Sequence, residues 1–190
     1  LDNRIGSKFL HAGPGYGGSC FPKDTLALLK TAQDNDTPIR IIEAVVQAND
    51  LRKRAMGRKI LNAVGEDARG KKVAILGLTF KPNTDDMRDA PSIAIVQTLM
   101  DACAIVTAYD PEGMEEAAKI MPEVEMVDSA YAAASGADAV AIVTEWDAFR
   151  ALDLGKLKSA MRGDALIDLR NIYRVEEVAK HGFNYVSVGR

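Results

Sequence analysis

From residue 71 to the carboxyl terminus, short apolar segments alternate with segments of helical periodicity. The apolar runs have the length of buried strands, and the intervening segments can return the chain to the next parallel strand. This alternation favours an α/β fold built on a doubly wound, mostly parallel sheet with right-handed crossovers. The predicted strands are 73–76, 105–109, 124–127, 139–143, 165–168 and 185–188. The predicted helices between them are 91–102, 114–120, 129–134, 154–161 and 175–180.

The first third of the chain predicts helices without strands. One helix is expected over 25–34, and Thr37-Pro38 marks the start of a second, which runs over 38–64 and ends before Gly65. A helix of about 26 residues is about 40 Å long, which suggests a connector or an oligomer interface. A polar linker follows it. We therefore expect a helical, dimerising segment over 1–66 and a Rossmann-like domain over 71–190.

Composition excludes several classes of protein. Hydrophobic residues make up 47% of the 190, enough for a sizeable core, yet no apolar run reaches the ~18 residues of a membrane span. A net charge of −3 provides no basic surface for nucleic acid. Two cysteines and two histidines at these spacings favour reduced thiols in a cytoplasmic protein over disulfides or a metal site. The chain begins without methionine or a signal peptide, so we expect it to be part of a longer protein.

Residues 13–24 combine a glycine-rich loop with one cysteine just before the first predicted helix. Glycines allow backbone conformations and close ligand approach that side chains would block. The helix dipole and Lys23 place positive charge near Cys20, so we expect a nucleophilic thiol. Asp24, one helical turn beyond Cys20, would cap the helix or orient a water molecule. The alternative is a tight turn around a structural cysteine. The loop's glycines are Gly13, Gly15, Gly17 and Gly18.

The end of the first predicted strand lacks the usual signature of a dinucleotide site. It continues as Gly-Leu-Thr-Phe-Lys-Pro over 77–82, without the Gly-x-Gly-x-x-Gly turn that lets the backbone approach a pyrophosphate. Asp110 follows the second strand, where a ribose-binding acid would stand, but its expected role is a turn or a cap. We therefore expect that this sheet does not hold a nicotinamide cofactor in the standard manner.

The long loop 79–90 is expected at the carboxyl edge of the sheet, where ligands of such folds bind. Phe80 can stack on a ring, Lys81 can meet a phosphate, and Arg88 can form bidentate anion contacts. Arg170, after the fifth strand, shares this edge. Glu145 follows the fourth strand and is expected to be a structural carboxylate. An ordinary charged surface loop is the alternative interpretation.

Three motifs together resemble the UDP-glucose/GDP-mannose dehydrogenase family, and in particular its bacterial members that act on UDP-glucose. The motifs are Gly-Tyr-Gly-Gly-Ser-Cys-Phe-Pro-Lys-Asp over 15–24, Gly-Leu-Thr-Phe-Lys-Pro-Asn-Thr-Asp-Asp-Met-Arg over 77–88, and Asp-Leu-Arg-Asn-Ile-Tyr over 168–173. They occur in the family's order, and the resemblance covers essentially the whole chain. It implies a long central helix and a carboxyl-terminal domain that binds the nucleotide sugar. The family's amino-terminal NAD-binding domain has no counterpart here.

The resemblance implies an NAD-dependent oxidation of the sugar C6 alcohol to a carboxylate. Cys20 would hold the intermediate aldehyde as a thiohemiacetal and then as a thioester, while Asp24 would position or activate water. Lys23 and Arg88 would contact the cofactor. The implied nucleotide-sugar contacts are Arg4, Phe9, Leu10, His11, Ala12, Gly13, Gly17, Phe80, Lys81 and Arg170, with Arg4 reaching the site of a neighbouring subunit. The long helix 38–64 would form the core of a homodimer.

Three alternatives remain open from the sequence. The chain alone, without a cofactor domain, would be a non-catalytic UDP-sugar-binding dimerisation module. The substrate would be GDP-mannose rather than UDP-glucose, since both groups of enzymes share the cysteine loop. A cysteine hydrolase would need a base near Cys20, and His11 is the nearby candidate, although no orienting partner for it is recognisable in the sequence.

Overall fold

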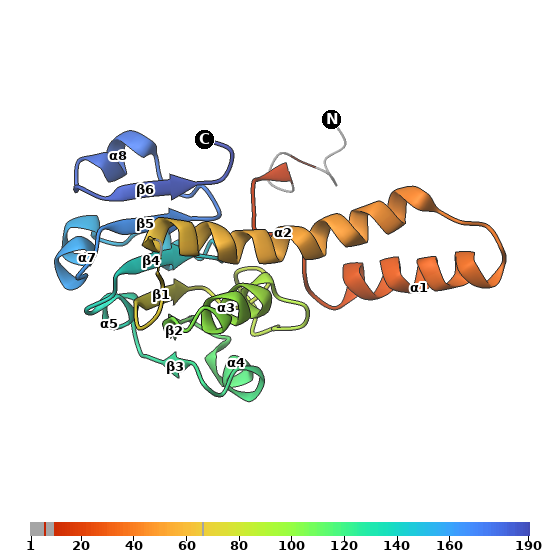
Figure 1. The fold of residues 1–190 in the computed structure, drawn as a ribbon, viewed down its shortest axis with the longest axis horizontal. Coiled ribbons are helices and arrows are strands. Elements are labelled where there is room, and N and C mark those ends of the chain that lie inside the picture. Colours follow the sequence, from red (N-terminus) through yellow and green to blue (C-terminus); the bar gives the residue numbers. More distant parts are fainter. Residues whose placement is uncertain (1–5, 7–9, 66) are drawn as a thin grey trace.

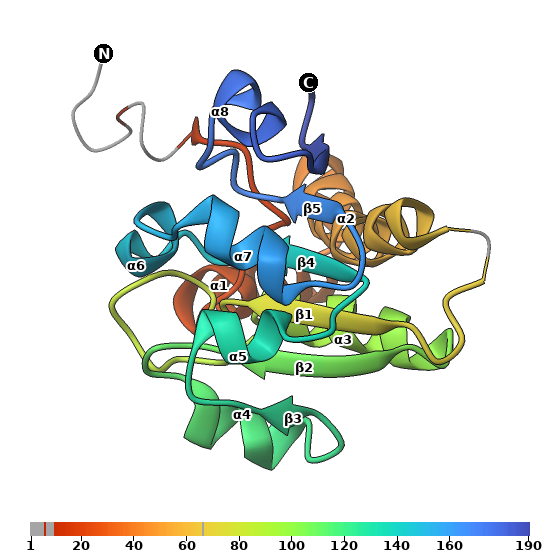
Figure 2. The ribbon, with the colours of Figure 1, turned by 90° about the vertical axis from the view of Figure 1, so that its left-hand side faces the viewer.

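The computed structural model describes residues 6, 10–65 and 67–190 and contains a six-stranded, fully parallel sheet of order β3-β2-β1-β4-β5-β6. The strand order reverses between β1 and β4, which confirms the predicted doubly wound, Rossmann-like sheet (Figures 1 and 2). The strands are β1 (Lys72–Leu76), β2 (Ile105–Tyr109), β3 (Glu125–Met126), β4 (Ala139–Ile142), β5 (Ala165–Asp168) and β6 (Asn184–Ser187).

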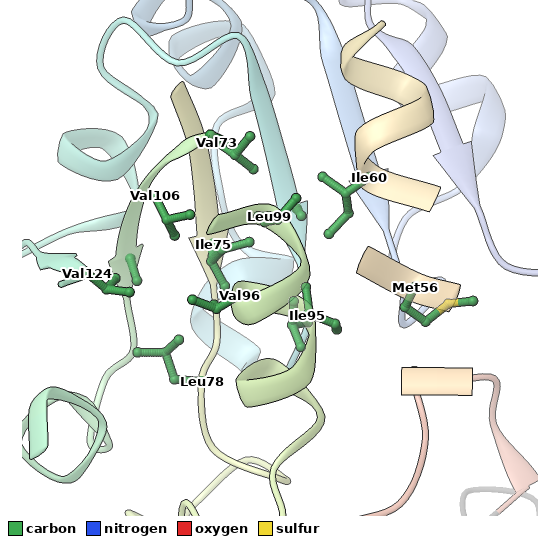
Figure 3. Close-up of a cluster of buried hydrophobic side chains, with 14 of the residues drawn as sticks. Met56, Ile60, Val73, Ile75, Leu78, Ile95, Val96, Leu99, Val106 and Val124 are labelled. Carbon is green, nitrogen blue, oxygen red and sulfur yellow. The ribbon is translucent and has the colours of Figure 1, made fainter. Parts of the chain in front are cut away.

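Helices cover both faces of the sheet because successive strand residues point to opposite sides. Val73 and Ile75 of β1 pack with α2 (Arg40–Val64) and α3 (Pro91–Asp101), as Figure 3 shows. Ala74 and Leu76 face the opposite cluster. That cluster includes residues of α5 (Ala130–Ala134), α6 (Asp147–Arg150), α7 (Leu154–Ala160) and α8 (Val175–Ala179), while α4 (Met114–Ile120) contributes to the first cluster.

The helix α2 packs on the sheet domain with its second half and forms a helical hairpin with α1 through its first half. Its five buried residues all lie between Asn49 and Ile60, and Met56 and Ile60 enter the core. The earlier half of α2 and the whole of α1 (Cys20–Asp34) extend away from the sheet as an antiparallel pair (Figure 1). The long predicted helix therefore exists and serves as a connector. Within the described residues, no helix combines the length and apolarity needed to cross a membrane.

The predicted strands and helices are confirmed to within a few residues, with three exceptions. α1 begins at Cys20 rather than at residue 25. α2 begins at Arg40, because the backbone amide and hydroxyl of Thr37 both donate to the Ala32 carbonyl at the end of α1 instead of capping α2. α6 was not predicted: it is one turn whose buried Phe149 fills the second cluster, too short to show helical periodicity.

Candidate active site

Asp110 organises the loops at the carboxyl edge of the sheet. Its carboxylate is fully buried at the end of β2 and accepts six hydrogen bonds. The donors are the backbone amides of Leu78, Thr79, Glu112 and Gly113, the Thr79 hydroxyl and the indole N–H of Trp146. These bonds place Asp110 in a turn, as predicted. The occupied carboxylate fixes the first residues of the loop that follows β1.

The loop after β1 places an aromatic ring and a cation side by side. The Phe80 amide donates to the Asp86 carbonyl at 3.2 Å, which folds the loop back on itself. The Lys81 ammonium lies 5.3 Å from the centroid of the Phe80 ring, within range of a cation–π contact. Farther along, Asp86 pairs with Arg88 through two bonds of 2.9 and 2.8 Å. This hydrogen-bonded guanidinium lowers the pKa of the Asp86 carboxyl below its ordinary value.

The glycine loop packs directly against this second loop. The Gly18 amide donates to the Arg88 carbonyl at 2.8 Å. A Cβ added at Gly18, where φ is +86°, would lie 2.8 Å from the Phe80 ring. A Cβ at Gly17 would overlap the Asp89 backbone. The glycines are thus required for close approach, here between two parts of the protein rather than only towards a ligand.

Most of the predicted substrate contacts line one cavity of about 770 Å³ between the glycine loop, α2 and the sheet edge. From the predicted set the cavity brings together His11, Ala12, Gly13, Gly17, Phe80, Lys81 and Arg170. Leu10 is 70% exposed and is not among the lining residues. Arg4 and Phe9 lie outside the described residues, so their predicted contacts stay predictions. The cavity combines cationic and aromatic side chains, which suits a charged ligand that carries a ring.

Arg170 lines this cavity and is held there by a carboxylate from the loop after the neighbouring strand. Its guanidinium pairs with the carboxylate of Glu145, and only 16% and 29% of the two side chains are exposed. Glu145 follows β4 and Arg170 follows β5, so adjacent strands bring the pair together. The Arg170 amide also donates to Asp168, which is fully buried, at 3.0 Å. This geometry matches the structural role expected for Glu145.

Cys20 is exposed in the first turn of α1. Its sulfur lies 3.6 Å from the Ser19 hydroxyl, and Cys20 lines a second cavity of about 560 Å³ together with Lys23 and Arg88. Asp24 lies one helical turn beyond the sulfur, with its carboxylate 3.1 Å from the Lys23 ammonium. The thiol and the cavity that contains Lys81 and Arg170 therefore lie beside neighbouring parts of the segment 11–23.

The cavity beside Cys20 carries two cationic side chains. Lys23 and Arg88 are exposed cations on its wall, which suits phosphate. At the end of β2, where a ribose-binding acid would stand, the Asp110 carboxylate is already occupied by hydrogen bonds from the protein. Lys23 and Arg88 thus fit the phosphates of a dinucleotide such as NAD.

The sequence reasoning missed residues of α2 and of the cysteine loop that line the cavity containing Lys81 and Arg170. Val45 and Arg52 line it, and Arg52 donates to the Gly13 carbonyl at 2.8 Å. Tyr16 and Phe21 line it too, with their rings edge to face at 4.6 Å. The spacing of Val45, Asn49, Arg52 and Lys53 puts these side chains on one face of α2. That spacing is the signal that could have indicated them.

Comparison with known proteins agrees with the three motifs. The UDP-binding domain model of the UDP-glucose/GDP-mannose dehydrogenase family matches residues 74–175, and the family's central domain model matches residues 1–51. The whole chain is 67% identical to a UDP-glucose 6-dehydrogenase of Rhizobium meliloti and 45% identical to one of Rickettsia bellii. It spans 44% of the length of each.

A solved structure supports the same relationship. The UDP-glucose dehydrogenase of the hyperthermophilic archaeon Pyrobaculum islandicum is 33% identical, with a TM-score of 0.82, over 98% of this chain and 40% of that one. The resemblance inferred from the cysteine loop and the two sheet-edge motifs is thereby confirmed.

Proposed function

Because this chain belongs to the UDP-glucose/GDP-mannose dehydrogenase family, we propose that it supplies the nucleotide-sugar-binding half, with the reactive thiol, of an NAD-dependent UDP-glucose 6-dehydrogenase. Residues 1–66 form the cysteine loop and the dimerising helices, and residues 71–190 form the domain that binds the nucleotide sugar. One observation carries the proposal. The glycine loop that lines the cavity containing Lys81 and Arg170 leads directly into Cys20.

In this proposal the cavity that contains Lys81 and Arg170 binds the nucleotide sugar mainly through its diphosphate. Lys81 and Arg170 face the diphosphate, and Phe80 provides a flat apolar surface for a ring. Glu145 keeps the Arg170 guanidinium in place before the ligand arrives. His11, Ala12, Gly13 and Gly17 bring backbone close to the sugar, and Phe9 and Leu10 belong to the same binding segment. Arg4 reaches the sugar bound by the neighbouring subunit of the proposed dimer.

The proposed reaction converts a primary alcohol into a carboxylate. NAD, when bound, would supply the hydride acceptor for the two oxidation steps. After the first step the Cys20 sulfur adds to the C6 aldehyde, the S–C bond forms, and the oxygen gains the proton. After the second, the product is a thioester on Cys20. Water oriented by Asp24 attacks it, the C–S bond breaks and the thiol is restored. The sum is UDP-glucose, two NAD⁺ and water giving UDP-glucuronate, two NADH and three protons.

NAD is proposed to contact this chain through Lys23 and Arg88, beside the thiol. Its remaining contacts would come from a separate NAD-binding domain, since Asp110 is already fully hydrogen-bonded. The two thiols need a reducing compartment, and we place the protein in the cytoplasm. A homodimer is proposed through α2, whose outer half and the adjacent α1 expose several large apolar side chains.

Cys20→Ser in the full-length protein tests the covalent mechanism. The expected result is loss of UDP-glucuronate formation with UDP-glucose binding retained, because serine lacks the nucleophilic thiol. NADH absorbance and chromatography of the sugar product would measure it. Cys103→Ser, at an exposed cysteine that follows α3 and lines neither of the two cavities, is the control and should keep full activity. Unchanged uronate production by Cys20→Ser would exclude the proposed role.

A second candidate function, binding without catalysis, is favoured by the saturated Asp110 carboxylate at the position of a ribose-binding acid. We expect the 190-residue chain alone to bind UDP-glucose in calorimetry and to produce no NADH. Measurable turnover by this chain would contradict that expectation. The same titration with GDP-mannose distinguishes the sugar-nucleotide alternatives, and tighter binding of GDP-mannose would assign the chain to the other substrate.

A further inference from the structure

The side-chain amide of Asn49 is bonded on both sides to one residue of the glycine loop. The Tyr16 amide donates to Asn49 Oδ1 at 2.8 Å, and Asn49 Nδ2 donates to the Tyr16 carbonyl at 3.1 Å. Asn49 lies on α2, 33 residues away in sequence, and only 7% of it is exposed. The Asn49 side chain thus bonds to the Tyr16 backbone as a neighbouring β-strand would. Both the N–H and the C=O of Tyr16 have a hydrogen-bond partner.

The loop has no room to move towards the helix. Gly15, with φ at +132°, lies so close to α2 that an added Cβ would be 2.8 Å from Asn49 Oδ1 and 3.1 Å from Lys53 Cγ. The backbone of the loop thus rests directly on two side chains of α2. Glycine is required here both by the conformation and by the contact.

The opposite side of the loop rests on the segment after β1. Gly18 donates to the Arg88 carbonyl, and the ammonium of Lys53 donates to the Asp89 carbonyl at 3.0 Å. Burial lowers the pKa of Lys53, and the charges of Asp89 and Asp50 oppose that shift. One face of α2 therefore holds both loops, the one that carries the thiol and the one that carries Lys81.

We propose that Asn49 is a positioning residue that fixes the thiol of Cys20 relative to the nucleotide-sugar cavity. The inference rests on the proposed function and adds to it a residue that touches neither substrate nor cofactor. Tyr16 is four residues before Cys20, so releasing its backbone would displace the thiol. Displacement of a reacting group by about 1 Å is enough to cost about 100-fold in rate. Lys81 and Arg170 lie in the loops that follow β1 and β5, and the Asn49 side chain bonds to neither loop, so we expect them to keep their places.

The test compares Asn49→Ala, which removes both bonds to Tyr16, with the isosteric Asn49→Asp, which removes the donor only. Asn62→Ala and Asn62→Asp are matched controls, since Asn62 is an exposed residue of the same helix. The first measurement is amide hydrogen exchange in the full-length protein. We expect residues 13–20 to exchange at least tenfold faster in the Asn49 variants and strand β4 to exchange as in the parent.

The second measurement is the steady-state kinetics of the full-length protein, with UDP-glucose affinity by calorimetry. We expect kcat to fall at least tenfold in Asn49→Ala and less in Asn49→Asp, and the dissociation constant of UDP-glucose to change by a smaller factor than kcat, because Lys81 and Arg170 keep their contacts. Unchanged exchange in 13–20, equal acceleration throughout the protein, or unchanged kcat would each overturn the positioning role. A parent protein that does not oxidise UDP-glucose would instead refute the proposed function, and the exchange pattern would still decide whether Asn49 holds the loop.

Discussion

Ion-paired carboxylates hold individual residues at both ends of the sheet. At the amino end, Asp138 accepts from the Lys72 amide at 2.8 Å and pairs with the guanidinium of Arg162. At the carboxyl end, Asp86 pairs with Arg88. In both cases the hydrogen-bonded arginine lowers the pKa of the carboxyl. Each carboxylate thus stabilises the fold in its ionised form.

Asp138→Asn should make stability less dependent on pH. Because the folded-state pKa of Asp138 lies below its ordinary value of 3.8, its contribution is complete above that value and is lost as the pH falls through the folded pKa. We expect a lower midpoint of urea unfolding for the variant at pH 7, and a difference from the parent that shrinks progressively as the pH falls below about 3.8. A constant difference between pH 7 and pH 3 would contradict this origin.

Lys81→Ala should weaken UDP-glucose binding by about 1.5–3 kcal/mol, the cost of losing a charged hydrogen bond. That loss raises the dissociation constant by roughly 10- to 150-fold, and calorimetry on the 190-residue chain would measure it. Lys119→Ala removes a lysine that pairs with Glu116 on α4 and should leave the affinity unchanged. An unaltered constant for Lys81→Ala would exclude the proposed phosphate contact.

At the scale of elements, α2 is the part of the chain on which both functional loops depend. Its carboxyl-terminal half packs on α3, and Gly57 lies at the closest point of that contact. A Cβ at this position would be 2.6 Å from Cβ of Thr98. The absence of a side chain lets the two helices approach, and this approach sets where Asn49 and Lys53 meet the loops.

Gly57→Ala should destabilise the protein even though alanine favours helix. Alanine stabilises a helix by about 1 kcal/mol relative to glycine. Overpacking the rigid contact with Thr98, however, costs about 1–3 kcal/mol. We expect a net loss in the free energy of unfolding, measured by urea titration. Gly155→Ala, in α7, is the control, because its nearest new neighbour would be the Asp153 carboxylate at 3.3 Å, and it should be close to neutral. Equal stability of Gly57→Ala and the parent would mean that α2 can shift on α3.

At the scale of the whole molecule, a compact sheet domain carries a projecting helical hairpin (Figure 1). The outer parts of α1 and α2 expose large apolar side chains, among them Leu26, Ile41 and Leu51. Ile41 is 79% exposed and Leu51 63%. Apolar surface of this kind is typical of an interface between subunits. It supports the proposed dimer, in which a second hairpin would cover these residues.

Ile41→Glu should convert the proposed dimer into a monomer, because a charge would be buried without a partner at the centre of the interface. Sedimentation velocity of the 190-residue chain would detect the change in mass. Ile105→Glu introduces the same charge at a 54% exposed position of β2, away from the hairpin, and should leave the mass unchanged. A dimer that persists in Ile41→Glu would place the interface elsewhere.

Local pattern alone determined much of this protein. Buried strands such as 73–76 are short apolar runs, and period and length are local properties, so the sheet and its helices could be predicted. The residue types of the cysteine loop and of the two sheet-edge motifs identified the family for the same reason. The prediction of Asp110 as a turn residue rested likewise on the missing glycine fingerprint beside it.

The tertiary structure decided the rest. Three contacts join residues that lie 25 to 38 positions apart in the sequence. They are the ion pair of Glu145 with Arg170, the two hydrogen bonds between Asn49 and Tyr16, and the close approach of Gly15 to α2. Which of these side chains meet depends on strand order, helix packing and loop direction, none of which is encoded in neighbouring residues. The sequence by itself determined the elements and the chemistry available to them, whereas packing of distant segments decided how that chemistry is arranged in space.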